Sequence, residues 1–175
     1  SPRSGDGVDE VMARIDAPLS SPRRILEIDY DTYADGEAEL GWVNLTARVD
    51  SADVGVDLDR LANTLVGEIA NEVIQVNLGQ IAHIKVSALG GDTQAVANVV
   101  SNESPIDVGL AAGRQVAGKL QVIVNARVAM DPSVLERICR DCVGSVMSGL
   151  NLNIESMIAH SLRPGRPTPT HRVTP

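Results

Sequence analysis

Aromatic residues are nearly absent from this chain of 175 residues. It has no Phe, and its only aromatic residues are Tyr30, Tyr33 and Trp42. Proteins that bind single-stranded nucleic acid stack the bases on aromatic rings, and this chain has almost no such rings to offer. Its hydrophobic core must therefore consist of Val, Ile, Leu, Ala and Met.

Long apolar runs and familiar catalytic motifs are also missing. No stretch approaches the ~18 to 20 apolar residues of a membrane span, and the N-terminus has no apolar signal-peptide core. We therefore expect a soluble, cytoplasmic protein. The sequence contains no phosphate-binding loop, dinucleotide fingerprint, zinc-protease motif or nucleophile elbow. No nucleophile is paired with a base, so we expect no catalysis from this chain.

Basic residues are outnumbered, with 15 Lys and Arg against 23 Asp and Glu, which gives a net charge of −8. A negative protein is repelled by phosphate backbones and by anionic membrane surfaces. We therefore expect neither nucleic acid nor a membrane as a partner.

The chain length suits one domain with appendages, at about 150 residues per domain. Residues 1–40 resemble an arm, punctuated by prolines, with a short amphipathic piece at 8–15. Residues 41–162 carry the regular patterns of a folded domain. Residues 163–175 are rich in Pro and Arg, which predicts an extended tail.

Hydrophobic periodicity predicts the elements of the central domain. Alternation of apolar and polar residues predicts strands at 42–50, 81–89, 93–100, 119–128 and 152–162. Apolar residues three or four apart predict helices over 58–76 and from Pro132 onward. Asp53 or Asp57 can cap the first helix, and Asp131 precedes Pro132 at the start of the second. We expect a polar loop at 101–114.

A faint internal repeat organises these elements. Ala47-Arg48-Val49 precedes Ile81-Ala82-His83, and Ala126-Arg127-Val128 precedes Ile158-Ala159-His160, at similar spacing. Two strand-helix-strand units with right-handed crossovers place both helices on one face of an open sheet. We therefore predict an α+β, ferredoxin-like sandwich with an extra hairpin strand.

The other face of this sheet is predicted to be polar. If the first strands of the two units lie side by side, Arg48 and Arg127 could converge on an anion or a partner carboxylate. The alternative is that both arginines are solvated or paired locally.

Cys139 and Cys142 form a CxxC inside the second predicted helix. They are either buried, inert thiols or part of a metal or redox site. A metal needs further ligands, for which His83, His160 and His171 are the candidates. The alternatives are a hydrogen-bonded surface imidazole at His83, a packed strand-end side chain at His160 and an extended tail at His171.

Trp42, Tyr30 and Tyr33 lie close together in the sequence. They either anchor the arm by burial or form an interface hot spot. The acidic residues around them lack the spacing of a calcium loop, so we expect a solvated acidic turn. The acidic residues of this predicted turn are Asp29, Asp31, Asp35, Glu37 and Glu39.

Two segments resemble a known family: Glu-Ile-Asp-Tyr-Asp-Thr-Tyr-Ala-Asp-Gly-Glu-Ala-Glu-Leu-Gly-Trp-Val-Asn at 27–44, and Leu-Arg-Pro-Gly-Arg-Pro-Thr-Pro-Thr-His-Arg at 162–172. Both resemble regions downstream of the GTPase domain in CobW-type P-loop proteins, the cobalamin-synthesis and metal-chaperone GTPases. The opening Ser-Pro-Arg-Ser-Gly-Asp-Gly-Val-Asp-Glu is similar to the stretch that closes such a GTPase domain.

The resemblance implies that this chain is the C-terminal portion of such a GTPase; the alternative is a stand-alone relative of its accessory domain. The family's phosphate loop, magnesium-binding acids and Cys-x-Cys-Cys motif all lie upstream. GTP, Mg and a transition metal are thus implied for a full-length parent, and no cofactor for this chain. The implied partners are its own GTPase domain, a metalloenzyme or corrinoid client protein, or a second copy.

The resemblance therefore implies an accessory, regulatory domain in metal or cobalamin cofactor delivery. Its expected contact surfaces are the polar sheet face and the residues Arg48, Arg127, Trp42, Arg163, Arg166 and Arg172, with His171 as the tail's metal candidate. The alternative is a stand-alone ligand sensor that dimerises through its sheet face and binds a small anionic metabolite at Arg48 and Arg127.

Overall fold

The computed structural model describes residues 4–17, 30–76 and 79–165. The chain divides into two compact units, one of Ser1–Ile28 with Pro169–Pro175 and one of Asp29–Thr168. Within the first unit, helix α1 spans Val8–Asp16 and has no buried residue. It confirms the amphipathic piece predicted there, and its apolar side chains are exposed, with Ile15 at 69%.

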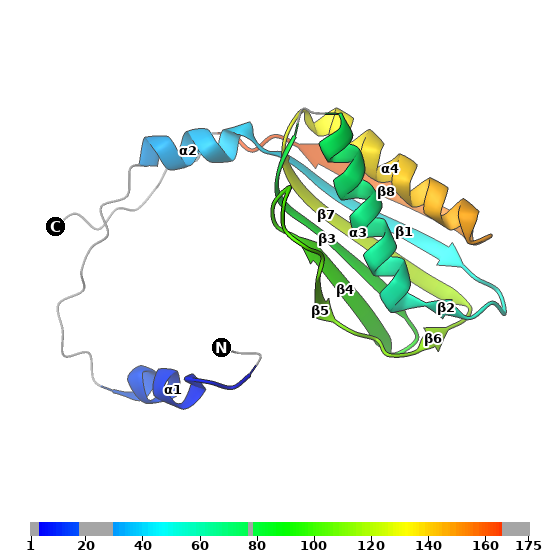
Figure 1. Cartoon of the computed structure of the whole chain (residues 1–175), viewed down its shortest axis with the longest axis horizontal. Helices are drawn as coiled ribbons and strands as arrows, with labels where there is room; N and C mark the ends of the chain where they lie inside the picture. Colours follow the sequence, from blue (N-terminus) through cyan, green and yellow to red (C-terminus); the bar gives the residue numbers. More distant parts are fainter. Residues whose placement is uncertain (1–3, 18–29, 77–78, 166–175) are drawn as a thin grey trace. The chain divides into compact units, whose positions relative to one another are not determined.

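The second unit is built on a six-stranded antiparallel sheet in the order β5-β4-β3-β7-β1-β8. The sheet is open and does not close on itself (Figure 1). Its strands are β1 (Gly41–Asp50), β3 (Gln80–Gly90), β4 (Thr93–Val99), β5 (Asp107–Leu110), β7 (Lys119–Ala129) and β8 (Asn153–Leu162). Two short strands, β2 (Val56–Asp57) and β6 (Gln115–Val116), pair separately.

The two strand-helix-strand units are β1-α3-β3 and β7-α4-β8, with α3 at Leu58–Gln75 and α4 at Pro132–Gly149. Strand β7 lies between β1 and β3, and β1 lies between β7 and β8, with each neighbouring pair antiparallel. The first strands of the two units are thus neighbours, as predicted. This is the predicted ferredoxin-like arrangement, extended beyond β3 by β4 and β5.

Both helices begin at an aspartate. The Asp57 carboxylate accepts from the Arg60 N–H at 2.9 Å, and the Asp131 carboxylate accepts from the N–H groups of Ser133 and Val134. These bonds satisfy donors that a helix N-terminus leaves open. They also hold the pKa of the Asp131 carboxyl below its usual value. Among the described helices, none is long and apolar enough to cross a membrane.

The core lies between the sheet and the two helices, which cover one face of it (Figure 1). Every second residue of β1 and β7 is buried there, including Leu45 and Val124 at 0% exposure. Leu65 of α3 and Leu135 of α4 are buried against them. Apolar residues recur every second position in the strands and about every 3.6 positions in the helices, and both sets are buried in one shared core.

The structure departs from the sequence predictions at three places. Residues Tyr30–Glu39 form helix α2 instead of a loop-like arm with an acidic turn. The predicted loop at 101–114 contains β5, whose four residues are all exposed and therefore show no alternation. The β2–β6 pair is only two residues long on each strand, too short for any period.

Candidate functional site

The face of the sheet opposite α3 and α4, called here the open face, carries neither of these two helices (Figure 1). It is formed by the strand residues that alternate with the buried ones. Most of these side chains are polar. They include Thr46 and Arg48 of β1, Gln121 and Asn125 of β7, Lys85 and Ser87 of β3, Asn98 of β4, and Ser156 and His160 of β8.

Three cations lie on the open face without an acidic partner among the described residues. Arg48 and Lys85 form no hydrogen bond or ion pair with any residue in the described ranges. Arg127 lies over the indole ring of Trp42, with its guanidinium carbon 4.1 Å from the ring centroid. Such a stack leaves the guanidinium edge able to bind a carboxylate. The open face therefore offers unpaired positive charge on a negative protein.

The structure does not bring Arg48 and Arg127 together, which corrects the expected convergence. Arg48 lies opposite Gln121, six residues before Arg127 on β7. At about 3.4 Å per residue the two side chains start roughly 20 Å apart. The reason is that β1 and β7 run antiparallel, so equivalent positions of the repeat fall at opposite ends. One small anion cannot bridge them.

Trp42 lies at one end of the open face, opposite Arg127 on β7 and Leu162 on β8. Its indole Nε1 is buried and has no hydrogen-bond partner among the described residues. The ring is half-buried, so it contributes to packing in addition to supporting Arg127.

The opposite end of the open face is acidic. Lys119 donates to Asp50 at 2.8 Å and also to Glu155, so two carboxylates share one ammonium. The hydrogen bond from Lys119 lowers the pKa of Asp50, and the same carboxylates raise the pKa of Lys119. The pattern of the sequence did not single out this cluster, because its members come from three different strands.

Amide and imidazole groups fill the area between the two ends. Asn125 donates its side-chain amide to the Asn44 side-chain oxygen across β7 and β1. His83 Nε2 lies 3.3 Å from the Asn98 side-chain oxygen. This confirms His83 as a hydrogen-bonded surface imidazole.

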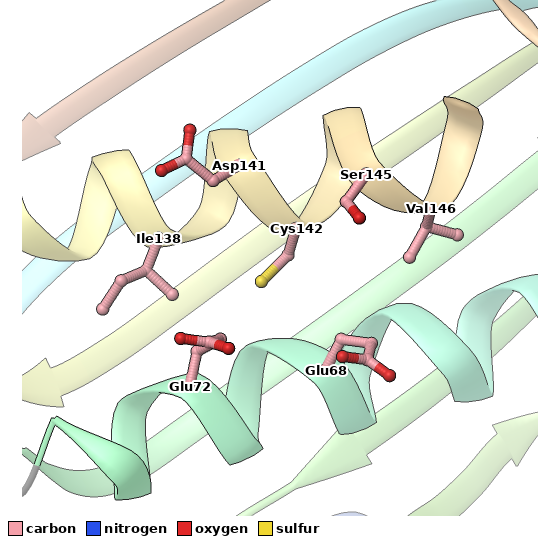
Figure 2. A pocket seen from close by; sticks show the side chains of 7 residues that line it. All are labelled: Glu68, Glu72, Ile138, Asp141, Cys142, Ser145 and Val146. Atoms are coloured by element: carbon pink, nitrogen blue, oxygen red, sulfur yellow. The ribbon is translucent and has the colours of Figure 1, made fainter. Parts of the chain in front are cut away.

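A groove of about 420 Å³ lies between α3 and α4, on the other side of the sheet. Figure 2 shows the Cys142 thiol of α4 pointing toward α3, near the carboxylates of Glu68 and Glu72. The groove is also lined by Ile138, Asp141, Ser145 and Val146.

The two cysteines are buried thiols. Burial, with Cys142 and Glu136 nearby, raises the pKa of Cys139 to about 12. Burial, with Glu72, Glu68 and Asp141 nearby, raises the pKa of Cys142 to about 11. Both remain protonated at neutral pH, whereas a thiolate is required for nucleophilic attack or metal binding. The structure confirms that both thiols are buried in the core.

The four metal candidates that the structure describes do not meet. Cys139 and Cys142 lie on the helix side of the sheet, whereas His83 and His160 belong to its open face. The two histidines are on β3 and β8, with β7 and β1 between them. No group of three or more His, Cys, Asp or Glu in the described ranges could hold a metal ion.

Of the remaining predicted site residues in the tail, the structure describes only Arg163. Arg163 donates to the backbone carbonyls of Ala38, Glu39 and Met130 at 3.1 to 3.2 Å, so its guanidinium joins the end of α2 to the end of β7. Arg166, Arg172 and His171 lie outside the described residues.

Comparison of the chain with protein-family models, with curated proteins and with solved structures finds no match. The resemblance to CobW-type GTPases therefore rests on the three quoted sequence segments alone.

Proposed function

We propose that this chain is a non-catalytic, protein-binding accessory domain of a CobW-like GTPase, and that the open face is its contact surface. The observation that carries the proposal is the charge of this face. Arg48, Lys85 and Arg127 have no acidic partner in the described part of the chain, although acids outnumber bases overall. Unpaired cations beside hydrogen-bonding amides suit a protein partner with exposed carboxylates.

The family resemblance supplies the setting of the proposal. It implies a cytoplasmic GTPase that delivers a metal or a corrinoid cofactor, with the nucleotide chemistry in an upstream domain. The role of this chain is then to couple that domain to a client protein or to a second copy. The alternative, a sensor of a small anionic metabolite at Arg48 and Arg127, loses its basis because the strand register separates these two residues.

Position-specific crosslinking tests the proposal. A photo-crosslinking residue is placed at Thr46 on the open face, and in a control at Ile74, which is 39% exposed on α3. We expect crosslinks to one polypeptide from position 46 only, and their loss in a Lys85→Glu background. Mass spectrometry should identify a P-loop GTPase, its client or this chain.

Equal, sparse crosslinking from both positions would overturn the proposal. Calorimetric titration with inorganic phosphate provides the complementary measurement. Saturable binding of phosphate that requires both Arg48 and Arg127 would favour the sensor instead.

A further inference from the structure

The two edges of the sheet differ in how well they are protected against pairing with another strand. The outer side of an edge strand carries backbone N–H and C=O groups without a partner, and proteins commonly protect it by keeping the strand short or by placing Lys or Pro in it. At one edge, β5 has only four residues, beginning at Asp107. At the other edge, β8 pairs with β1 from Asn153 to Leu162, so its outer side is ten residues long. β8 is therefore the longer template for an added strand, and no described strand pairs with its outer side.

The sequence of β8 does little to protect this edge. Among its ten residues there is no Lys, Arg or Pro, and the single carboxylate is that of Glu155. A bulge beside Glu155 interrupts the pairing with β1, but the strand runs regularly from Ser156 to Leu162. Arg140 of α4 donates to the Met157 carbonyl at 3.4 Å, and a carbonyl oxygen can accept a second hydrogen bond. The outer side of β8 is thus open to another strand.

Apolar side chains of β8 are partly exposed on both faces of the sheet. On the open face, Ile158 is 60% exposed and Leu162 is 49% exposed. On the helix side, Ile154, Met157 and Ala159 pack against the core but are only half-buried. A strand added at this edge therefore gains contacts on both faces if it also carries apolar residues on both. β8 itself is such a strand.

We propose that two copies of this chain pair β8 against β8, antiparallel, about a two-fold axis that passes through the sheet at Ile158. The inference goes beyond the proposed function, because it concerns the edge of the sheet and not its open face. Directly opposed residues of an antiparallel pair lie on the same face of the sheet. A symmetric pairing is therefore centred on one residue of the strand, which lies opposite its own copy.

The apolar residues select the register. When the axis passes at Ile158, this side chain meets its own copy on the open face, and Met157 meets Ala159 on the helix side. Ser156 then lies opposite His160, and a hydroxyl can hydrogen-bond to an imidazole. An axis at Met157 would instead set Ile158 against Ser156, and an axis at Ala159 would set it against His160. Only the axis at Ile158 matches apolar side chains on both faces.

Charge favours the antiparallel orientation. Each Glu155 lies level with Ser161 of the other copy, so the two Glu155 side chains are six residues apart along the strands, or roughly 20 Å. A parallel pairing in register would set them side by side, which is destabilising. On the helix side, Arg140 is already paired with Glu136 at 2.8 Å. Neither Glu155 nor Arg140 therefore brings an unpaired like charge to the axis.

The pairing leaves the open face free. A two-fold axis that passes through the sheet keeps the open faces of both copies on the same side of one continuous sheet. The contact surface of the proposed function is then doubled and not covered. A single strand pair buries less than the about 1,200 Å² of a standard interface, so we expect a dimer that dissociates on dilution.

Sedimentation of the full chain over a dilution series tests the proposal. We expect a reversible dimer with twice the chain mass of 18.5 kDa. Ile158→Arg sets two like charges against each other at the axis, so it should weaken association by more than about tenfold. The matched control is Leu110→Arg on β5, the other edge, where the side chain is 47% exposed. It should leave association unchanged, and circular dichroism checks that both variants are folded.

Disulfide crosslinking tests the register. Opposed Cβ atoms of an antiparallel pair lie about 4.5–5.5 Å apart, close to the spacing in a disulfide, so mild oxidation of Ile158→Cys should link two copies. The two copies of Ser156 lie four residues apart, at about 14 Å, so Ser156→Cys alone should link at least about tenfold more slowly. An equal mixture of Ser156→Cys and His160→Cys should link, because these positions face each other. The native Cys139 and Cys142 are buried and protonated, so they compete little.

A chain that stays monomeric at every concentration would overturn the dimer. A dimer that withstands Ile158→Arg would show that the interface lies elsewhere. Equal crosslinking of Ile158→Cys and Ser156→Cys would overturn the register. None of these results bears on the proposed function, because crosslinks from Thr46 report on the open face alone.

Discussion

Alternate residues of the same strands form the two faces of the sheet. The two faces differ in which side chains they can hold without loss of stability. On β7, Val122, Val124 and Ala126 are at most 1% exposed under the helices, whereas their neighbours Gln121 and Ile123 are only half-buried. Burying a charge without a partner costs several kcal/mol, so the covered face must be apolar. On the open face, water can solvate Arg48 and Lys85, which have no charged partner in the part of the chain that the structure describes. Folding thus constrains the first face, and the second is free to serve binding.

Neighbouring substitutions on β7 should show this difference most strongly. Val124→Asp places a carboxylate in the core and should destabilise the fold by about 3–5 kcal/mol, enough to unfold much of the protein. Ile123→Asp, one residue away, should cost about 1 kcal/mol or less. Urea unfolding of both variants at low protein concentration gives the comparison. Equal destabilisation would mean that the open face is covered by another part of the chain.

Thiol reactivity should separate the two faces by about two orders of magnitude. The increase in the pKa of Cys142 from 9.0 to about 11 lowers its thiolate fraction at neutral pH, by about a hundredfold. In native protein, an aromatic disulfide reagent should label Cys139 and Cys142 at least about a hundred times more slowly than the thiol introduced by Thr46→Cys. Unfolding should make all the thiols react at similar rates. Fast labelling of the native cysteines would show that the groove between α3 and α4 opens readily.

Loss of the helix cap at Asp131, on the covered side of the sheet, should lower stability less than a charge in the core does. Asp131→Ala removes the acceptor for the Ser133 and Val134 N–H groups, and should lower Tm by about 2–4 °C. The control Asp53→Ala changes an exposed loop residue that caps no helix, and its Tm should match wild type. Thermal melts of both variants and of the wild type measure this difference in Tm. An unchanged Tm for Asp131→Ala would show that α4 is held by packing alone.

The smallest expected effect is a change in the pH dependence of stability when Glu136 is replaced. Glu136 accepts from Ser161 at 2.6 Å and from Arg140 at 2.8 Å, and these bonds hold its pKa below the ordinary 4.5. A lowered carboxyl pKa stabilises the fold above the unfolded value, and this contribution is lost as pH falls through the folded one. Below about pH 4.5, Glu136→Gln should therefore lose stability less steeply than wild type. Urea midpoints at several pH values measure this, and Glu103→Gln, on an exposed turn, serves as control. Parallel profiles for wild type and Glu136→Gln would contradict the assignment.

Local patterns predicted most of the fold. Alternation located β1, β3, β4, β7 and β8, because each has one face in the core and one outside it. Apolar spacing and the two capping aspartates located α3 and α4. Helix α2 was missed because Tyr30–Glu39 is rich in acids and has no apolar stripe. Strand β5 was missed because all four of its residues are exposed.

The sequence alone determined which residues face the core, where the main helices begin and that two similar units occur in order, because these properties depend on spacing along a few turns or strands. Only the tertiary structure decided how the chemistry is distributed. Antiparallel pairing sends Arg48 and Arg127 to opposite ends of the open face, and the sheet itself separates the cysteines from His83 and His160. Both results depend on strand order and direction, which join residues about 80 positions apart and which no local period encodes.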